Sequence, residues 1–82
     1  SESINDIAPT IMDFLHEHKY QMIEEDYKMC LLVVVGIAPK YIKNILFCSS
    51  QKISMQRKRL LKSLFNEEGT PSTFDYKLRS LK

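Results

Sequence analysis

Hydrophobic side chains recur at intervals of three and four residues along most of the chain, which is the spacing of one face of an α-helix. The longest example is the segment 50–65, where Ile53, Leu60 and Leu64 share one face and most polar side chains fall on the others. On this pattern the expected helices lie near 4–18, 24–36, 39–47, 50–65 and 73–81. The sequence therefore predicts an all-α fold, a small helical bundle of about five helices.

The apolar run before Gly36 has two interpretations. Val33, Val34 and Val35 are β-branched, and by propensity they favour a strand. Three acidic residues precede the run and Gly36 follows it, however, as at the start and end of a helix. No other run could pair with a lone strand and satisfy its backbone groups. We therefore expect a buried helix that ends at Gly36.

Residues that cap helices place the other boundaries. Pro39 suits the first position of the short third helix, and Ser49 suits the N-cap of the helix that follows. Ser72 or Thr73 is the expected cap of the last helix. A short helix, a turn of about three residues and a longer basic helix form a helix-turn-helix, whose second helix enters the major groove of DNA.

Charge is distributed unevenly, although the net charge is only +2. Residues 1–26 carry seven acidic side chains and one basic side chain, whereas residues 27–66 carry eight basic and no acidic side chains. The eight cations are Lys28, Lys40, Lys43, Lys52, Arg57, Lys58, Arg59 and Lys62. Such a segment predicts a polyanionic partner. The alternative is a solvated basic surface with no target.

Other kinds of chemistry find little support. Cys30 and Cys48 lie in apolar surroundings with no CxxC pair, so we expect free thiols in a reducing cytoplasm, although their number also allows one disulfide. His16 and His18 point apart on a helix and could not share a metal ion. The sequence contains no plausible catalytic triad, no pair of inward-facing carboxylates and no glycine-rich loop. We therefore expect no enzyme, no cofactor, no metal and no small-molecule substrate.

The expected location of the protein is the cytoplasm. The longest apolar run, residues 29–35, is far too short to span a membrane. The polar and acidic residues 1–6 do not have the pattern of a signal peptide.

Residues 22–65 resemble the LuxR-type (GerE-type) helix-turn-helix domain of bacterial transcription regulators. The similarity runs without a gap from Gly36-Ile37-Ala38-Pro39-Lys40 to Leu64. Upstream, Met22-Ile23-Glu24-Glu25-Asp26 is similar to the start of the family's first helix. The presence of a cysteine, Cys30, within that helix resembles a subgroup of sensor proteins in the family. The resemblance divides the chain into an N-terminal connecting or dimerisation helix (1–21), a helix-turn-helix core (22–65) and a loop with a C-terminal helix (66–82).

The resemblance implies a DNA-binding module of a bacterial transcription regulator. Its partners would be double-stranded DNA, a second copy in a homodimer, and an upstream sensor region of the full-length protein. The helix 50–65 would lie in the major groove. By position, the residues that reach base edges are Ser54, Met55, Lys58 and Arg59. The cations assigned to phosphate are Lys40, Lys52, Arg57 and Lys62.

Several residues depart from the family pattern. Ile23 and Ala38 replace capping Thr and Ser residues, and Lys43 replaces a small Ala at a contact between helices. These changes allow an alternative function: a degenerate helix-turn-helix that acts as a protein–protein interaction or dimerisation domain, with its basic region against an acidic partner.

Overall fold

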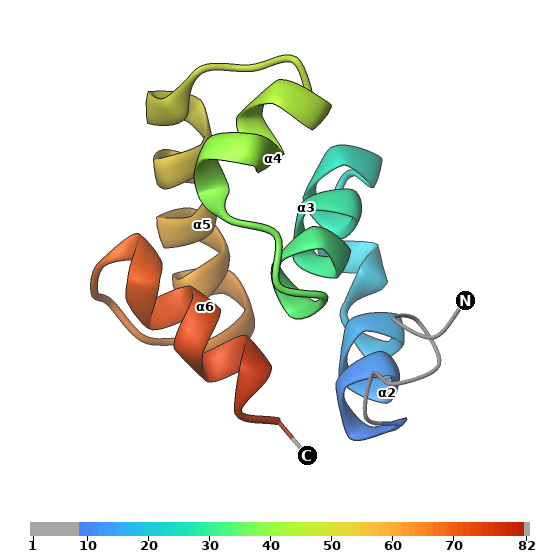
Figure 1. Cartoon of the computed structure of the whole chain (residues 1–82). Coiled ribbons are helices and arrows are strands. Elements are labelled where there is room, and N and C mark those ends of the chain that lie inside the picture. The colour runs from blue at the N-terminus through green and yellow to red at the C-terminus, as the bar shows by residue number, and fades with distance from the viewer. Residues whose placement is uncertain (1–8, 82) are drawn as a thin grey trace.

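A computed structural model describes residues 9–81 of the chain (Figure 1). Its elements are α2 (Pro9–Glu17), the 3-10 turn η1 (Lys19–Gln21), α3 (Glu24–Val34), α4 (Pro39–Ile45), α5 (Ser50–Phe65) and α6 (Pro71–Arg79). No strand occurs within this range, so the expected all-α class is confirmed. The expected start of the first helix, with Ile4 and Ile7, lies outside the described residues. No helix between residues 9 and 81 is both long and apolar enough to cross a membrane.

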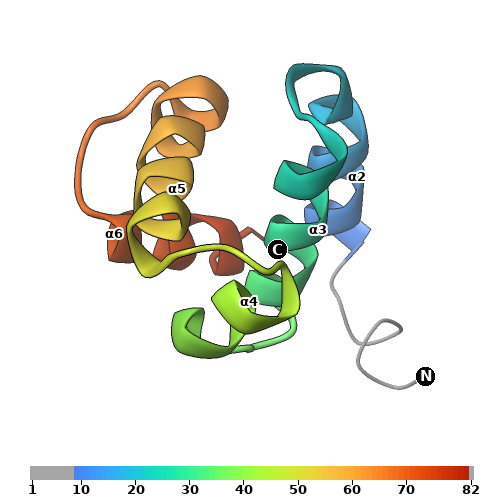
Figure 2. The same ribbon diagram turned by 90° about the horizontal axis from the view of Figure 1, so that it is seen from above.

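The helices surround a single core. The α5 helix packs against α4 and α6, and α3 packs against the same two helices, as both views illustrate (Figures 1 and 2). The buried apolar residues are Ile11, Leu15, Met29, Cys30, Val33, Ile42, Ile53, Leu60, Leu61, Leu64, Phe74 and Leu78. The flanking helices α2 and α6 contribute to this core as α3, α4 and α5 do. The buried apolar residues of these two helices are therefore used within the chain.

The valine-rich segment is helical, as expected. Val33 is 1% exposed, so burial of its side chain outweighs the strand propensity of the run. The helix ends where Gly36 takes a φ of 94°, a left-handed conformation that glycine adopts without steric cost. Arg79 of α6 donates through Nε to the Val33 carbonyl at 2.9 Å, and this carbonyl at the end of α3 also accepts from the Gly36 amide at 3.1 Å.

Two of the three expected helix starts, at Pro39 and at Ser49, are confirmed. Pro39 occupies the first turn of α4, and Ser49 Oγ accepts a hydrogen bond from the Lys52 amide at 3.1 Å. The expected cap of the last helix is wrong, because Thr70 is the N-cap and accepts from the Thr73 amide at 3.3 Å. The helix begins earlier than expected since Pro71, which was assigned to the loop, suits the first helical position.

The two isoleucines of α4 differ in burial. Ile42 is fully buried, whereas Ile45 is 50% exposed. Ile45 is the last residue of α4, and Phe47 then adopts a φ of 56°, which turns the chain away from the helical path.

Candidate nucleic-acid interface

The α5 helix has one face in the core and the opposite face in solvent. Its buried residues are Ile53, Gln56, Arg57, Leu60, Leu61 and Leu64. A continuous exposed stripe, which we call the α5 outer face, consists of Gln51, Met55, Lys58 and Lys62. The helix carries five basic and no acidic residues. The outer face therefore brings together one expected base-reading cation, one expected phosphate-binding cation and the apolar side chain of Met55, which is 62% exposed.

Lys58 and Lys62 are the uncompensated cations of this face. Within residues 9–81, neither takes part in an ion pair. Their charge is therefore available to an external anion.

Arg57 does not belong to the interface, contrary to the expectation that it contacts phosphate. Its side chain is only 6% exposed, and its guanidinium makes a two-pronged ion pair with Asp75 of α6, in which Nε lies 3.0 Å from Oδ1 and Nη2 contacts Oδ2. The geometry matches a planar guanidinium to a carboxylate. Arg57 therefore joins α5 to α6, and the sequence position of Asp75 gave no direct signal of this pairing.

Arg59 lies beside the outer face and is bound to α3. Its Nη2 donates to Asp26 Oδ1 at 2.8 Å, while its side chain remains 53% exposed. Asp26 is 1% exposed and also accepts from Gln56 Nε2 and, through Oδ2, from the Ile23 amide at 3.3 Å. The carboxylate thus supplies the second half of a capping box, because it accepts from the amide of the N-cap residue, while Ile23 has no side-chain acceptor for the first half.

Lys52 is exposed but is also paired. Its Nζ lies 3.2 Å from Glu25 Oε1 in the first turn of α3. Lys52, Met55 and Arg59 meet at a surface hollow of about 410 Å³, whose other lining residues are Ile23, Glu25 and Gln56. The structure therefore brings three expected interface residues to one place, next to carboxylates that sequence reasoning had not placed there.

The two remaining expected site residues, Ser54 and Lys40, are placed less favourably for contact with DNA. Ser54 is half-buried at the edge of α5. Lys40 is exposed on α4, where its Nζ lies 5.2 Å from the centre of the Tyr41 ring. The hydroxyl of Ser54 is therefore only partly accessible to a ligand. Lys40 lies on a different helix and can only add an outer contact to the α5 outer face.

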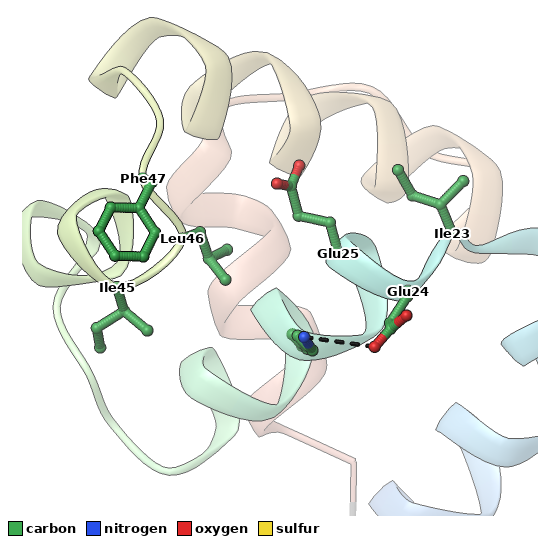
Figure 3. A pocket seen from close by; sticks show the side chains of 7 residues that line it. Ile23, Glu24, Glu25, Ile45, Leu46 and Phe47 are labelled. Atoms are coloured by element: carbon green, nitrogen blue, oxygen red, sulfur yellow. Dashed lines mark ion pairs between the residues drawn. The ribbon is translucent and has the colours of Figure 1, made fainter.

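A second hollow, of about 530 Å³, lies between the start of α3 and the end of α4 (Figure 3). On one side are Ile45, Leu46 and Phe47, and on the other are Ile23 and the carboxylates of Glu24 and Glu25. The dashed line in Figure 3 marks the ion pair between Lys28 and Glu24, at 3.4 Å.

Phe47 is 93% exposed. Its left-handed backbone (φ 56°) is uncommon for an aromatic residue. The apolar pattern of the sequence places Phe47 at the end of the third expected helix and gives no signal of this exposed position.

The two cysteines are free, and neither belongs to a metal site. The described part of the chain contains no group of three His, Cys, Asp or Glu residues able to hold a metal ion. Burial, with smaller contributions from the negative charges of Asp26 and Asp75, raises the pKa of the Cys30 thiol to about 12. Cys30 is therefore a protonated core residue, and its Sγ contacts Met22 Sδ at 3.8 Å.

Comparisons of the chain with protein-family models, with curated proteins and with solved structures found no match.

Proposed function

We propose that this chain is a DNA-binding module of a bacterial transcription regulator, with α5 in the major groove of double-stranded DNA. The observation that carries the proposal is the α5 outer face, which combines Lys58 and Lys62, both without ion pairs among residues 9–81, with the exposed Met55. The resemblance of residues 22–65 to LuxR-type domains implies the same role for this helix.

The chemistry of this face matches the needs of groove binding. Lysines without local partners release counterions from the phosphate backbone, which supplies sequence-independent affinity. Met55 offers apolar contact to a thymine methyl group, and Arg59 at the edge offers the planar donors that base edges accept. Such modules act as dimers on paired half-sites.

The carboxylates of α3 limit this attraction. Glu25 and Asp26 neutralise Lys52 and Arg59, so these two cations meet phosphate only if an ion pair is exchanged or shared. We therefore assign the general attraction to Lys58 and Lys62, with Lys40 as an outer contact, and remove Arg57 from the interface.

Substitution of one unpaired lysine, Lys62, tests the proposal. In a tethered dimer, Lys62→Ala is expected to weaken duplex binding for all sequences alike and to reduce the slope of log Kd against log salt by about 1 per protomer. Lys77→Ala is the matched control, because Lys77 lies on α6 and pairs with Glu67. Equal effects of the two substitutions on the slope, measured by fluorescence anisotropy, would refute the assignment.

A second candidate function is docking to another protein. The observation that favours it is the set of exposed apolar side chains around the hollow of Figure 3, where Ile23 is 64%, Ile45 50% and Phe47 93% exposed. Phe47→Ser separates the two functions. Loss of self-association or of a protein partner with unchanged duplex affinity would support docking, and loss of duplex affinity alone would favour the nucleic-acid function.

A further inference from the structure

Asp26 is the most completely buried carboxylate among the described residues, and it directs an exposed guanidinium. Its side chain is 1% exposed and accepts hydrogen bonds from the Ile23 amide, from Gln56 and from Arg59. A carboxylate with several donors in a low-dielectric site is held in one orientation. Asp26 therefore fixes the position of whatever it binds.

The guanidinium of Arg59 is only partly used by this contact. One Nη2 hydrogen bond goes to Asp26, and no other hydrogen bond ties the group to residues 9–81. A guanidinium has five N–H donors in a planar arrangement. Arg59 therefore keeps donors free for a ligand, and it does so at the hollow that it shares with Met55 and Lys52.

Orientation matters more for base reading than for phosphate binding. A guanine presents O6 and N7 to the major groove, and arginine binds both acceptors only when its plane is aligned with them. A side chain that is already held loses less conformational freedom on binding. The unpaired Lys58 and Lys62, by contrast, act as mobile point charges.

We propose that Asp26 is a positioning residue that holds Arg59 as the reader of a guanine in each half-site. The inference rests on the proposed DNA-binding function and adds a division of roles to it: Lys58 and Lys62 supply affinity, and the Asp26–Arg59 pair supplies preference for one base.

Selection of duplexes from a random pool tests this division, using tethered dimers of the wild type and of Asp26→Asn, Arg59→Lys and Glu25→Gln. The wild type is expected to enrich a guanine at a fixed position of each half-site. Asp26→Asn and Arg59→Lys are expected to reduce that preference about tenfold, and at that position alone. Glu25→Gln is the matched control, since Glu25 pairs with Lys52 rather than Arg59, and it should keep the preference.

The outcomes separate the inference from the function on which it rests. If the wild type enriches no duplex, the proposed function fails. If the wild type enriches a sequence and both variants keep the same guanine, the inference alone fails.

Because Asp26→Asn also removes a helix cap, side-chain NMR of the free wild-type chain provides a second test. Slow rotation of the Arg59 guanidinium supports the positioning role, and rotation as fast as in an unattached arginine would overturn it.

Discussion

At the scale of single residues, the polar side chains of α5 divide into those that hold the fold and those that face solvent. Arg57 and Arg59 are two residues apart, yet the first keeps only 6% of its side chain exposed and is bound to Asp75, while the second keeps 53% of its side chain exposed. Helical geometry explains the difference, because a shift of two residues rotates the side chain by about 200° around the axis. The same charge therefore serves packing at one position, and we propose that it serves recognition at the other.

The Arg57–Asp75 pair predicts a large loss of stability on truncation. Arg57→Met leaves the Asp75 carboxylate, 15% exposed, without its partner, and we expect the free energy of unfolding to fall by about 3 kcal/mol. Urea denaturation followed by circular dichroism measures this loss. Lys58→Met, on the exposed side of the same helix, is the control and should change stability by less than about 0.5 kcal/mol. Equal stabilities of the two variants would contradict the structural role of Arg57.

The Cys30 thiol predicts a dependence of stability on alkaline pH. Its pKa is raised from 9.0 to about 12 in the folded chain, so between these values the unfolded chain loses the thiol proton first. The contribution of Cys30 is therefore constant below pH 9 and is lost as the pH rises from 9 towards 12. The difference in unfolding free energy between the wild type and Cys30→Ala should shrink from pH 8 to pH 10.5. A constant difference would show that the thiol is not desolvated.

At the scale of elements, the starts of the helices differ in how well they are capped. Ser49 caps α5 and Thr70 caps α6 through their side chains, whereas Ala38 begins α4 without a side-chain hydrogen bond. The short α4 is nevertheless ordered, because Ile42 is fully buried between its neighbours. Packing thus compensates for a missing cap in the element that leads into the turn before α5.

Restoring the missing cap predicts a gain in stability. Ala38 has the extended backbone of an N-cap, with φ −68° and ψ 147°, so Ala38→Ser requires no rearrangement. We expect the free energy of unfolding to rise by about 1 kcal/mol, and Ser49→Ala to lower it by a similar amount. Thermal denaturation measures both changes. A neutral or destabilising Ala38→Ser would mean that the amides at the start of α4 are already satisfied.

At the scale of the whole molecule, periodic elements were predictable from the sequence and pairings between distant residues were not. The bounds of α5 follow from its apolar stripe and from Ser49. Gly36 marks the end of α3 because few residues other than glycine adopt the left-handed backbone found there. The pairing of Arg57 with Asp75, by contrast, depends on how α6 docks against α5. Within residues 9–81, the helices α2 to α6 all contribute side chains to one core.

The candidate site was predictable only in part for the same reason. Helical spacing places Met55, Lys58 and Lys62 on one face, and the structure agrees. The acids of residues 24–26 lie at a helix start, as expected, but their pairing with Lys52 and Arg59 arises because the first turn of α3 lies within side-chain reach of α5. The net charge of residues 27–66 therefore overstates the number of cations that are available to a polyanion.

We propose that the α5 outer face binds the phosphate backbone and grooves of duplex DNA. The dissociation constant of a tethered dimer for duplexes from 50 to 300 mM salt tests this directly. We expect measurable binding whose log Kd rises linearly and steeply with log salt, because Lys58 and Lys62 of each protomer displace counterions. Absence of binding to any selected duplex, or binding that does not change with salt, would contradict it.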